Sequence, residues 1–262
     1  MRSLLQRLGE AIAAYLVRPR PDLRPPAVVG ERAWQAELRP CDVLLVDGSS
    51  KISAGIKYLT QSTWSHSALY VGDAGGSTVD GEPAVLLEAD MRDGVCAVPL
   101  SKYALYNVRI CRPAELAPDD VERVLRFAVE SIGQQYDLRN VIDLARWLLP
   151  EPPVPARFRR RLMALGSGEP TRAICSTLIA RCFQSVGYPI LPSVTEEHPD
   201  GPRFRPRHHS FVTPRDFDLS PYFDVVKPSL SGTFDYRSFP WHEDARPEAA
   251  SLPLARRAAD PR

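Results

Sequence analysis

The sequence predicts an α+β fold built around an antiparallel sheet. Short apolar runs typical of strands gather between residues 43 and 112, and turn-rich segments separate them. A helical pattern precedes this group at the N-terminus, and further helical patterns follow it from residue 119 onward. An order of helix, grouped strands and helices is typical of an α+β protein whose sheet is antiparallel.

Length and composition are those of an ordinary globular protein with one sizeable core. The chain has 262 residues, of which 44% are hydrophobic and 25% are charged. The 33 basic and 32 acidic side chains leave a net charge of +1, so no strong overall field indicates a nucleic-acid partner. The 26 prolines, about twice the usual share, are clustered and indicate inserts around a single domain over residues 27–240.

Both ends of the chain are expected to lie outside this domain. Residues 1–26 combine an amphipathic helix with a Pro-rich link. We expect the helix to pack on its own domain; the alternative is peripheral contact with a membrane surface, which its basic residues and apolar face would suit. No export signal or run of about 18 apolar residues is evident, which predicts a cytoplasmic location. Residues 241–262 are predicted to be a disordered tail.

The strands follow from local patterns. Residues 43–46 form a short apolar run that a turn closes, and residues 52–60 indicate a short helix after it. Two strand-like runs, at residues 66–72 and 84–89, flank a Gly-rich loop and predict an antiparallel hairpin. The remaining expected strands lie at residues 95–100, 107–112 and 223–226.

Helices are expected after the strands. Residues 119–132 have apolar side chains at helical spacing, with Asp119 or Asp120 as the N-cap and Gly133 as the stop signal. A second helix is predicted over residues 138–149. A third helix, expected over residues 174–187, has the clearest helical spacing of apolar residues.

The helix expected over residues 174–187 carries the predicted nucleophile, Cys175. Cys182 lies on the apolar stripe of this helix and is assigned to the core, whereas Cys175 lies at the helix start, outside the stripe. A thiol at that position is close to the positive end of the helix dipole and to unpaired backbone N–H groups, which lower its pKa. Five cysteines without CxxC spacing also argue against a disulfide framework and a structural zinc site.

A nucleophilic cysteine needs a base, and His66 is the candidate. It alone among the five histidines lies in a strand-like context. If the hairpin is centred on Ser77, His66 and Glu88 are direct cross-strand neighbours on one face. Glu88 would then hold the imidazole in the tautomer that a base needs. Asp90, on the same strand face, is the alternative acid.

Several segments of the sequence resemble one family. The main ones are CDVLLV and WSHSALYVG at residues 41–46 and 64–72, LEA at residues 87–89, and ICSTLI at residues 174–179. They resemble the circularly permuted branch of the NlpC-type papain-like superfamily, and within it the YiiX and YaeF group of amidases. In that branch the His and the acidic residue precede the Cys-bearing helix, as His66, Glu88 and Cys175 do here. Two shorter segments agree with the resemblance, GQQYD at residues 133–137 and TPRDF at residues 213–217.

The resemblance implies a permuted papain-like fold, with an antiparallel sheet packed against the helix that carries the catalytic Cys175. It also implies a hydrolase or acyltransferase that acts on an amide or ester through an acyl-thioester and needs no cofactor. The implied substrate is an acylated, lipid-like or peptide amide; a cell-wall peptide is less favoured because no export signal is evident. The backbone N–H of Cys175 and the side chain of Tyr136 are the candidate donors to the oxyanion.

Functions other than catalysis by a cysteine also stay open. A catalytically silent module of the same fold would bind a lipid or peptide, and trapping of an acyl-enzyme would distinguish it from an enzyme. A metal site at His208 and His209 is not expected, because adjacent histidines on an extended segment point to opposite faces. The basic loop at residues 203–209 is expected to be solvated surface rather than a site for phosphates, lipid head groups or nucleic acid.

Overall fold

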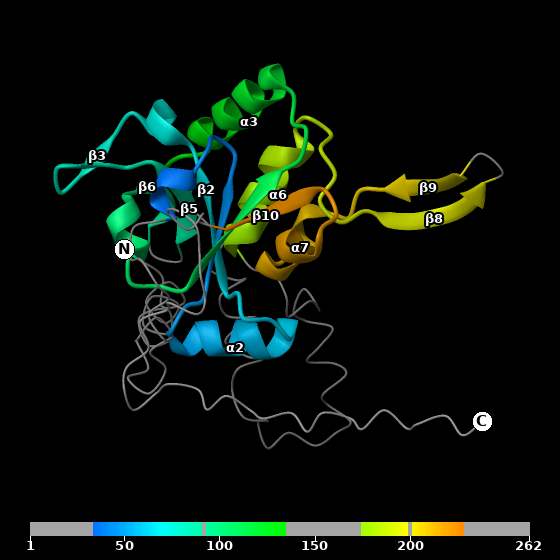
Figure 1. Cartoon of the computed structure of the whole chain (residues 1–262), viewed down its shortest axis with the longest axis horizontal. Coiled ribbons are helices and arrows are strands. Elements are labelled where there is room, and N and C mark those ends of the chain that lie inside the picture. Colours follow the sequence, from blue (N-terminus) through cyan, green and yellow to red (C-terminus); the bar gives the residue numbers. More distant parts are fainter. Residues whose placement is uncertain (1–33, 91–92, 135–173, 199–200, 228–262) are drawn as a thin grey trace, which may run out of the picture. The chain divides into compact units, whose positions relative to one another are not determined.

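A six-stranded antiparallel sheet forms the centre of the described chain (Figure 1). The structure is a computed structural model, and it describes residues 34–90, 93–134, 174–198 and 201–227. The strand order is β10-β7-β1-β2-β5-β6, and every neighbouring pair is antiparallel. The predicted α+β class with an antiparallel sheet is therefore confirmed. The strands are β1 (Val43–Val46), β2 (His66–Tyr70), β5 (Leu86–Asp90), β6 (Gly94–Val98), β7 (Val108–Pro113) and β10 (Phe223–Val226).

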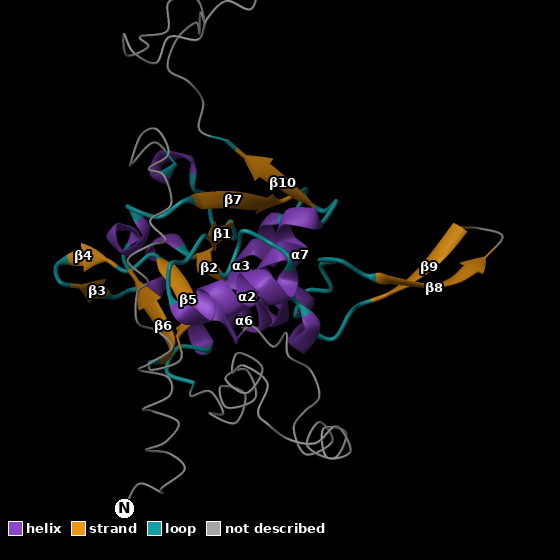
Figure 2. Cartoon of the chain, turned by 90° about the horizontal axis from the view of Figure 1, so that it is seen from below, coloured by secondary structure: helices purple, strands orange, loops and turns teal. Residues whose placement is uncertain are grey.

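Helices and two small ribbons complete the described chain. The α-helices are α2 (Lys51–Thr60), α3 (Pro118–Glu130), α6 (Ile174–Gln184) and α7 (Pro214–Leu219). Short 3-10 helices are η1 (Gln35–Glu37), η2 (Gly72–Gly75), η3 (Leu100–Tyr103) and η4 (His209–Phe211). One ribbon pairs β3 (Thr78–Val79) with β4 (Glu82–Pro83), and the other pairs β8 (Ser193–His198) with β9 (Gly201–Arg205). Figure 2 shows the second ribbon extending away from the other described elements.

The central strands bury both of their faces. Successive side chains of a strand point to opposite faces, so the run Val-Leu-Leu-Val in β1 supplies two cores at once. Val43 and Leu45 pack with Leu69 and Leu87 on the face that α6 covers. The other face has its own apolar cluster, made by Trp34, Leu44, Val46, Ala68, Leu86, Tyr103 and Ile110.

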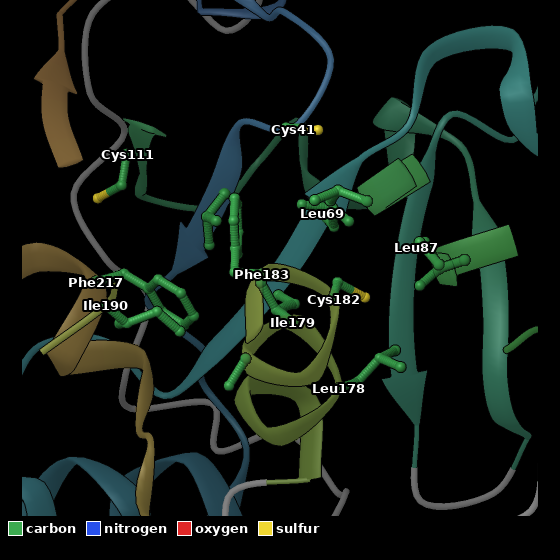
Figure 3. Close-up of a cluster of buried hydrophobic side chains, with 14 of the residues drawn as sticks. Cys41, Leu69, Leu87, Cys111, Leu178, Ile179, Cys182, Phe183, Ile190 and Phe217 are labelled. Atoms are coloured by element: carbon green, nitrogen blue, oxygen red, sulfur yellow. The ribbon is translucent and has the colours of Figure 1, made fainter. Parts of the chain in front are cut away.

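The helix α6 is held against the sheet by its apolar stripe. Leu178, Ile179, Cys182 and Phe183 are fully buried, and Figure 3 shows them clustered with apolar side chains of the sheet. Full burial of an aliphatic or aromatic side chain of this size contributes about 1.5–3 kcal/mol. The predicted helix and its core residues are confirmed, although the helix ends at Gln184 rather than at Gly187, and its stripe packs it against the strands β2 and β5.

Two predicted boundaries are wrong for identifiable reasons. The N-cap of α3 is Ala117 rather than Asp119 or Asp120, because Pro118 occupies the first helical position. The two aspartates fall in the first helical turn, where the helix dipole favours them. The strand expected at residues 95–100 ends at Val98, since Pro99 lacks the N–H that would continue the ladder.

Several predictions lie outside the described residues. They are the N-terminal helix and link at residues 1–26, the helix at residues 138–149 and the tail at residues 241–262. Among the described elements, no helix combines the length and apolar character that crossing a bilayer requires.

Candidate active site

Cys175 is the second residue of α6 and is 4% exposed. The first four N–H groups of an α-helix have no acceptor within the helix, so the Cys175 N–H lies among donors directed out of the helix end. The partial positive charge of the same end favours a thiolate over a thiol. The predicted position of Cys175 at the helix start is therefore where the structure places it.

His66 begins β2, and its Nε2 lies 3.0 Å from Oε2 of Glu88 on β5. Glu88 is fully buried, whereas about a quarter of the His66 side chain is accessible. The structure thus brings these two predicted residues together. The alternative acid, Asp90, is the last residue of β5 and is paired with Gly94.

The predicted register of this hairpin is wrong by two residues. β2 and β5 pair Leu69 with Leu87, so the same register continued places Glu88 opposite Ala68 rather than opposite His66. The connection is not a turn centred on Ser77, because it contains η2 and the ribbon of β3 and β4. An even shift keeps every side chain on its face, so Glu88 becomes a diagonal neighbour of His66 and still reaches it.

Cys175 and His66 lie close enough for each to shift the pKa of the other, through charge and hydrogen bonding. Because Nε2 of His66 faces Glu88, Nδ1 is the ring nitrogen left for the sulfur. Burial alone raises the pKa of the Cys175 thiol, but the charge of His66 and its hydrogen bond outweigh burial and lower that pKa. Burial likewise lowers the pKa of His66, and Cys175 and Glu88 together raise it to about 10. These opposite shifts favour a thiolate beside an imidazolium at neutral pH.

Glu88 accepts hydrogen bonds from three donors. Besides His66, the ammonium of Lys102 donates to Oε1, and the hydroxyl of Tyr103 donates to Oε2. Burial raises the pKa of Glu88, but His66 and Lys102 outweigh it and lower the pKa to about 2. Glu88 is therefore a carboxylate even though it is fully buried.

Lys102 and Tyr103 are site residues that the sequence did not reveal. Both belong to η3, the 3-10 turn that follows β6 after Pro99. The Tyr103 ring also lies 6.0 Å from the His66 ring, centroid to centroid. One feature of the sequence could have indicated them: η3 follows β6 directly along the chain, and β6 pairs with β5, the strand that carries Glu88.

The other cysteines have the opposite electrostatic environment. Burial raises the pKa of Cys41, Cys111 and Cys182 to about 12, and raises that of the partly buried Cys96 to about 11. These four residues are thiols at neutral pH. Cys175 differs from them in having an imidazole beside its sulfur.

The adjacent histidines are arranged differently from the prediction. The His208 and His209 rings lie 4.0 Å apart, because a 3-10 turn begins at His209 and the segment is not extended. Nδ1 of His208 hydrogen bonds with the Ser210 hydroxyl. Within the ranges that the structure describes, no group of three His, Cys, Asp or Glu side chains is arranged to hold a metal ion. The other predicted oxyanion donor, Tyr136, lies outside those ranges.

A pocket of about 550 Å³ lies at the other end of α6. Cys175 precedes the pocket residue Gln184 by nine positions, which is roughly 13 Å along a helix axis. Another lining residue, Val212, accepts a hydrogen bond from the hydroxyl of Ser176, the residue after Cys175, whereas Cys175, His66 and Glu88 themselves do not line the pocket. Its lining is mostly apolar and comes from Gln184, Gly187, Tyr188, Pro189, Ile190, Leu191, Pro192, Phe204, Pro206, Arg207, Val212 and Tyr222.

Comparisons with known proteins give one distant relative. No family model matches the chain. A protein of Escherichia coli strain K12 described as the probable lipoprotein peptidase YaeF is 22% identical over 170 residues, which cover 59% of this chain and 58% of YaeF. The match thus spans less than two thirds of that relative. The crystal structure of YiiX from Escherichia coli O157:H7, described as a metalloprotein, aligns with 73% of this chain and 97% of YiiX, at 15% identity and a TM-score of 0.45. The chain is weakly homologous to YaeF.

Proposed function

We propose that this protein is a cysteine-dependent amide or ester hydrolase or acyltransferase. Cys175 is the nucleophile, and His66 is the general base and acid. Glu88 orients the imidazole and stabilises its protonated form. The observation that carries the proposal is the hydrogen bond of His66 with the buried Glu88, together with the electrostatic coupling of the same imidazole to Cys175 at the start of α6. A nucleophile, a base and a group that orients the base are the constellation that acyl transfer requires.

The reaction begins from the ion pair of Cys175 and His66. The thiolate attacks the acyl carbon, and the carbonyl oxygen becomes an oxyanion that the Cys175 N–H, at the start of α6, is suited to bind. The imidazolium of His66 then gives its proton to the departing amine or alcohol, which leaves an acyl-thioester on Cys175. Water or another acceptor, deprotonated by His66, attacks the thioester, and the thiolate of Cys175 departs, which restores its ion pair with the imidazolium.

Glu88 contributes by remaining ionised. A carboxylate that accepts from Nε2 fixes the ring orientation and stabilises the imidazolium, which is present at the start of the reaction and forms again during deacylation. Lys102 and Tyr103 occupy the other positions on this carboxylate and make its burial tolerable. They act through Glu88 and are positioning residues.

The substrate class that we propose is an acylated, lipid-like or peptide amide. The description of YaeF as a probable lipoprotein peptidase supports amide hydrolysis by a relative, at 22% identity over part of its length. The chain order of His66, Glu88 and Cys175 also supports assignment of the fold as permuted papain-like, because the helix of the nucleophile follows the strands that carry its partners. No cofactor takes part in this scheme.

Acyl-enzyme trapping tests the proposal directly. The full chain is incubated with p-nitrophenyl esters of short and long acyl chains and with acyl-peptide amides, and the intact protein and its Cys175 peptide are weighed by mass spectrometry. We expect an adduct with the mass of one acyl group, abolished by Cys175→Ala and retained by the control Cys96→Ala.

Two outcomes contradict the proposal. An adduct that persists at full occupancy in Cys175→Ala would place the acyl group elsewhere. Complete absence of both adduct and product with every donor would instead favour a silent binding module of the same fold.

A further inference from the structure

Ser67, the residue after His66 in β2, has a hydroxyl that the fold alone does not explain. The residue is fully buried. Its Oγ is the one buried side-chain oxygen or nitrogen, within the described part of the chain, that has no hydrogen-bond partner. An unpaired buried hydroxyl costs about 1–3 kcal/mol. A group retained at that cost suggests a function.

The alternation of β2 directs this side chain toward α6. Ser67 shares its face with Leu69 and is paired with Leu45, and both leucines belong to the cluster on which α6 packs. His66, one residue earlier, points to the other face, where it meets Glu88. His66 and Ser67 therefore approach the start of α6 from different sides.

The backbone of Ser67 is also directed toward the Cys175 sulfur. Tyr70 donates its N–H to the carbonyl of Asp42, the residue before β1. N–H groups alternate in direction along an antiparallel strand, so the N–H of Ser67, three residues earlier, points to the opposite side, toward β5. The pairing of β2 with β5 ends at Leu69, which leaves that N–H without a strand partner. The sulfur of Cys175 lies close enough to Ser67 for the N–H and the hydroxyl of this residue to lower the pKa of the thiol.

We propose that the Ser67 hydroxyl donates a hydrogen bond to the sulfur of Cys175 and that Ser67 is a fourth catalytic residue, stabilising the thiolate on the side away from His66. This inference rests on the proposed role of Cys175 as the nucleophile. It gives the buried hydroxyl a partner in the ionised site and a reason to be retained.

The test measures the thiolate itself and needs no substrate. The rate at which iodoacetamide alkylates Cys175 in the full chain is followed from pH 4 to pH 10 by mass spectrometry of the Cys175 peptide. We expect Ser67→Ala to move the acid limb of this profile upward by about one pH unit, because a hydrogen bond to a charged group is lost. Well below both midpoints the variant should react about tenfold more slowly than the native protein.

Two controls distinguish the proposed role of Ser67 from a purely structural one: a measurement of Tm and a variant of a second buried serine. Ser67→Ala should lower Tm less below the acid limb of the profile than above it, because the lost hydrogen bond stabilises the thiolate, whereas the loss of a purely structural contact would lower Tm equally at both pH values. Ser65→Ala removes a buried hydroxyl that accepts from the Gly48 N–H, and it should leave the alkylation profile unchanged.

The outcomes separate this inference from the proposed function. Superimposable profiles for the native protein and Ser67→Ala, or an equal shift in Ser65→Ala, would overturn the inference. If the native profile has the midpoint of an ordinary thiol and does not respond to His66→Ala, the proposed nucleophile fails, and the Ser67 inference fails with it.

Discussion

Lys102, together with His66, keeps the fully buried Glu88 in its carboxylate form. The pKa of Glu88 in the folded protein is about 2, below its ordinary value of 4.5. A depressed pKa means that the ionised group contributes stability above about pH 4.5, and that this contribution is lost as the pH falls toward 2. Removal of the ammonium should raise the pKa of Glu88 in the folded state and shrink that contribution.

Lys102→Met should therefore lower Tm at pH 7 and make the fall of Tm between about pH 4.5 and pH 2 shallower than in the native protein. Lys102→Arg retains the positive charge and is the matched control. Thermal unfolding followed by circular dichroism across this range measures both curves. Parallel curves for the native protein and Lys102→Met would show that Lys102 does not act on Glu88.

Glu88 contributes to the alkaline limit of the site. Cys175 and, to a smaller extent, Glu88 raise the pKa of His66 to about 10, so the imidazolium persists to about that pH. In Glu88→Gln the alkaline limb of the pH profile for hydrolysis of an activated ester should move to lower pH, because the ring loses its proton earlier. Glu130→Gln, on the exposed end of α3, is the charge-matched control. An unchanged alkaline limb in Glu88→Gln would disprove the coupling.

At the residue scale, the sequence predicted those site residues whose position follows from a single helix or strand. Cys175 was predictable because helical periodicity locates the start of α6, and His66 because a strand surrounds it. Lys102, Tyr103 and Ser67 were not, because their roles depend on tertiary contacts that no local pattern encodes. A 3-10 turn after a proline and a serine in an apolar strand are common features with ordinary explanations.

The position of α6 depends on the aromatic group around Phe183. This side chain is fully buried, and its ring lies 5.2–6.5 Å from those of Tyr188, Phe217 and Phe223, centroid to centroid. Phe183→Ala should lower the free energy of unfolding by about 3–5 kcal/mol, as large cavities in a core do. Urea denaturation measures the change. Val194→Ala, on the exposed surface of β8, should change it by less than about 0.5 kcal/mol, and equal effects would contradict the packing described.

The turn after α6 offers a purely conformational test. Gly187 has φ +73°, and a Cβ built there meets nothing within 4 Å. Gly187→Ala should therefore cost about 1–2 kcal/mol through backbone strain alone. Gly187→Asn should cost less, because asparagine tolerates the left-handed region. Unfolding free energies from urea titration would refute the strain argument if the two variants were equally destabilised.

At the element scale, the sequence predicted the members of the sheet better than their register. The six strands were predictable because each is a short apolar run between turns. The pairing of β2 with β5 was not, since an inserted ribbon breaks the symmetry that a simple hairpin would have. The ribbon of β8 and β9 was missed because its residues are largely polar and lack an apolar alternation.

The five cysteines of the whole chain should differ sharply in reactivity. Cys41, Cys111 and Cys182 are buried thiols with raised pKa values, and Cys96 has a raised pKa as well. Brief treatment of the folded protein with iodoacetamide at pH 7 should therefore label Cys175 first. His66→Ala should slow that labelling to the rate of Cys96, and preferential labelling of any other cysteine in the native protein would contradict the assignment.

Because the ribbon between β2 and β5 is exposed, the geometry of the site does not depend on the number of residues between His66 and Glu88. Residues 76–83 are all exposed, and the strands on either side are anchored by buried leucines rather than by the ribbon. Residues gained or lost there need not move His66 relative to Glu88. A search for related proteins should therefore leave the number of residues between the histidine and the carboxylate free. It should require that both residues point to the same face of neighbouring strands, because a fixed spacing would overlook relatives with the same chemistry.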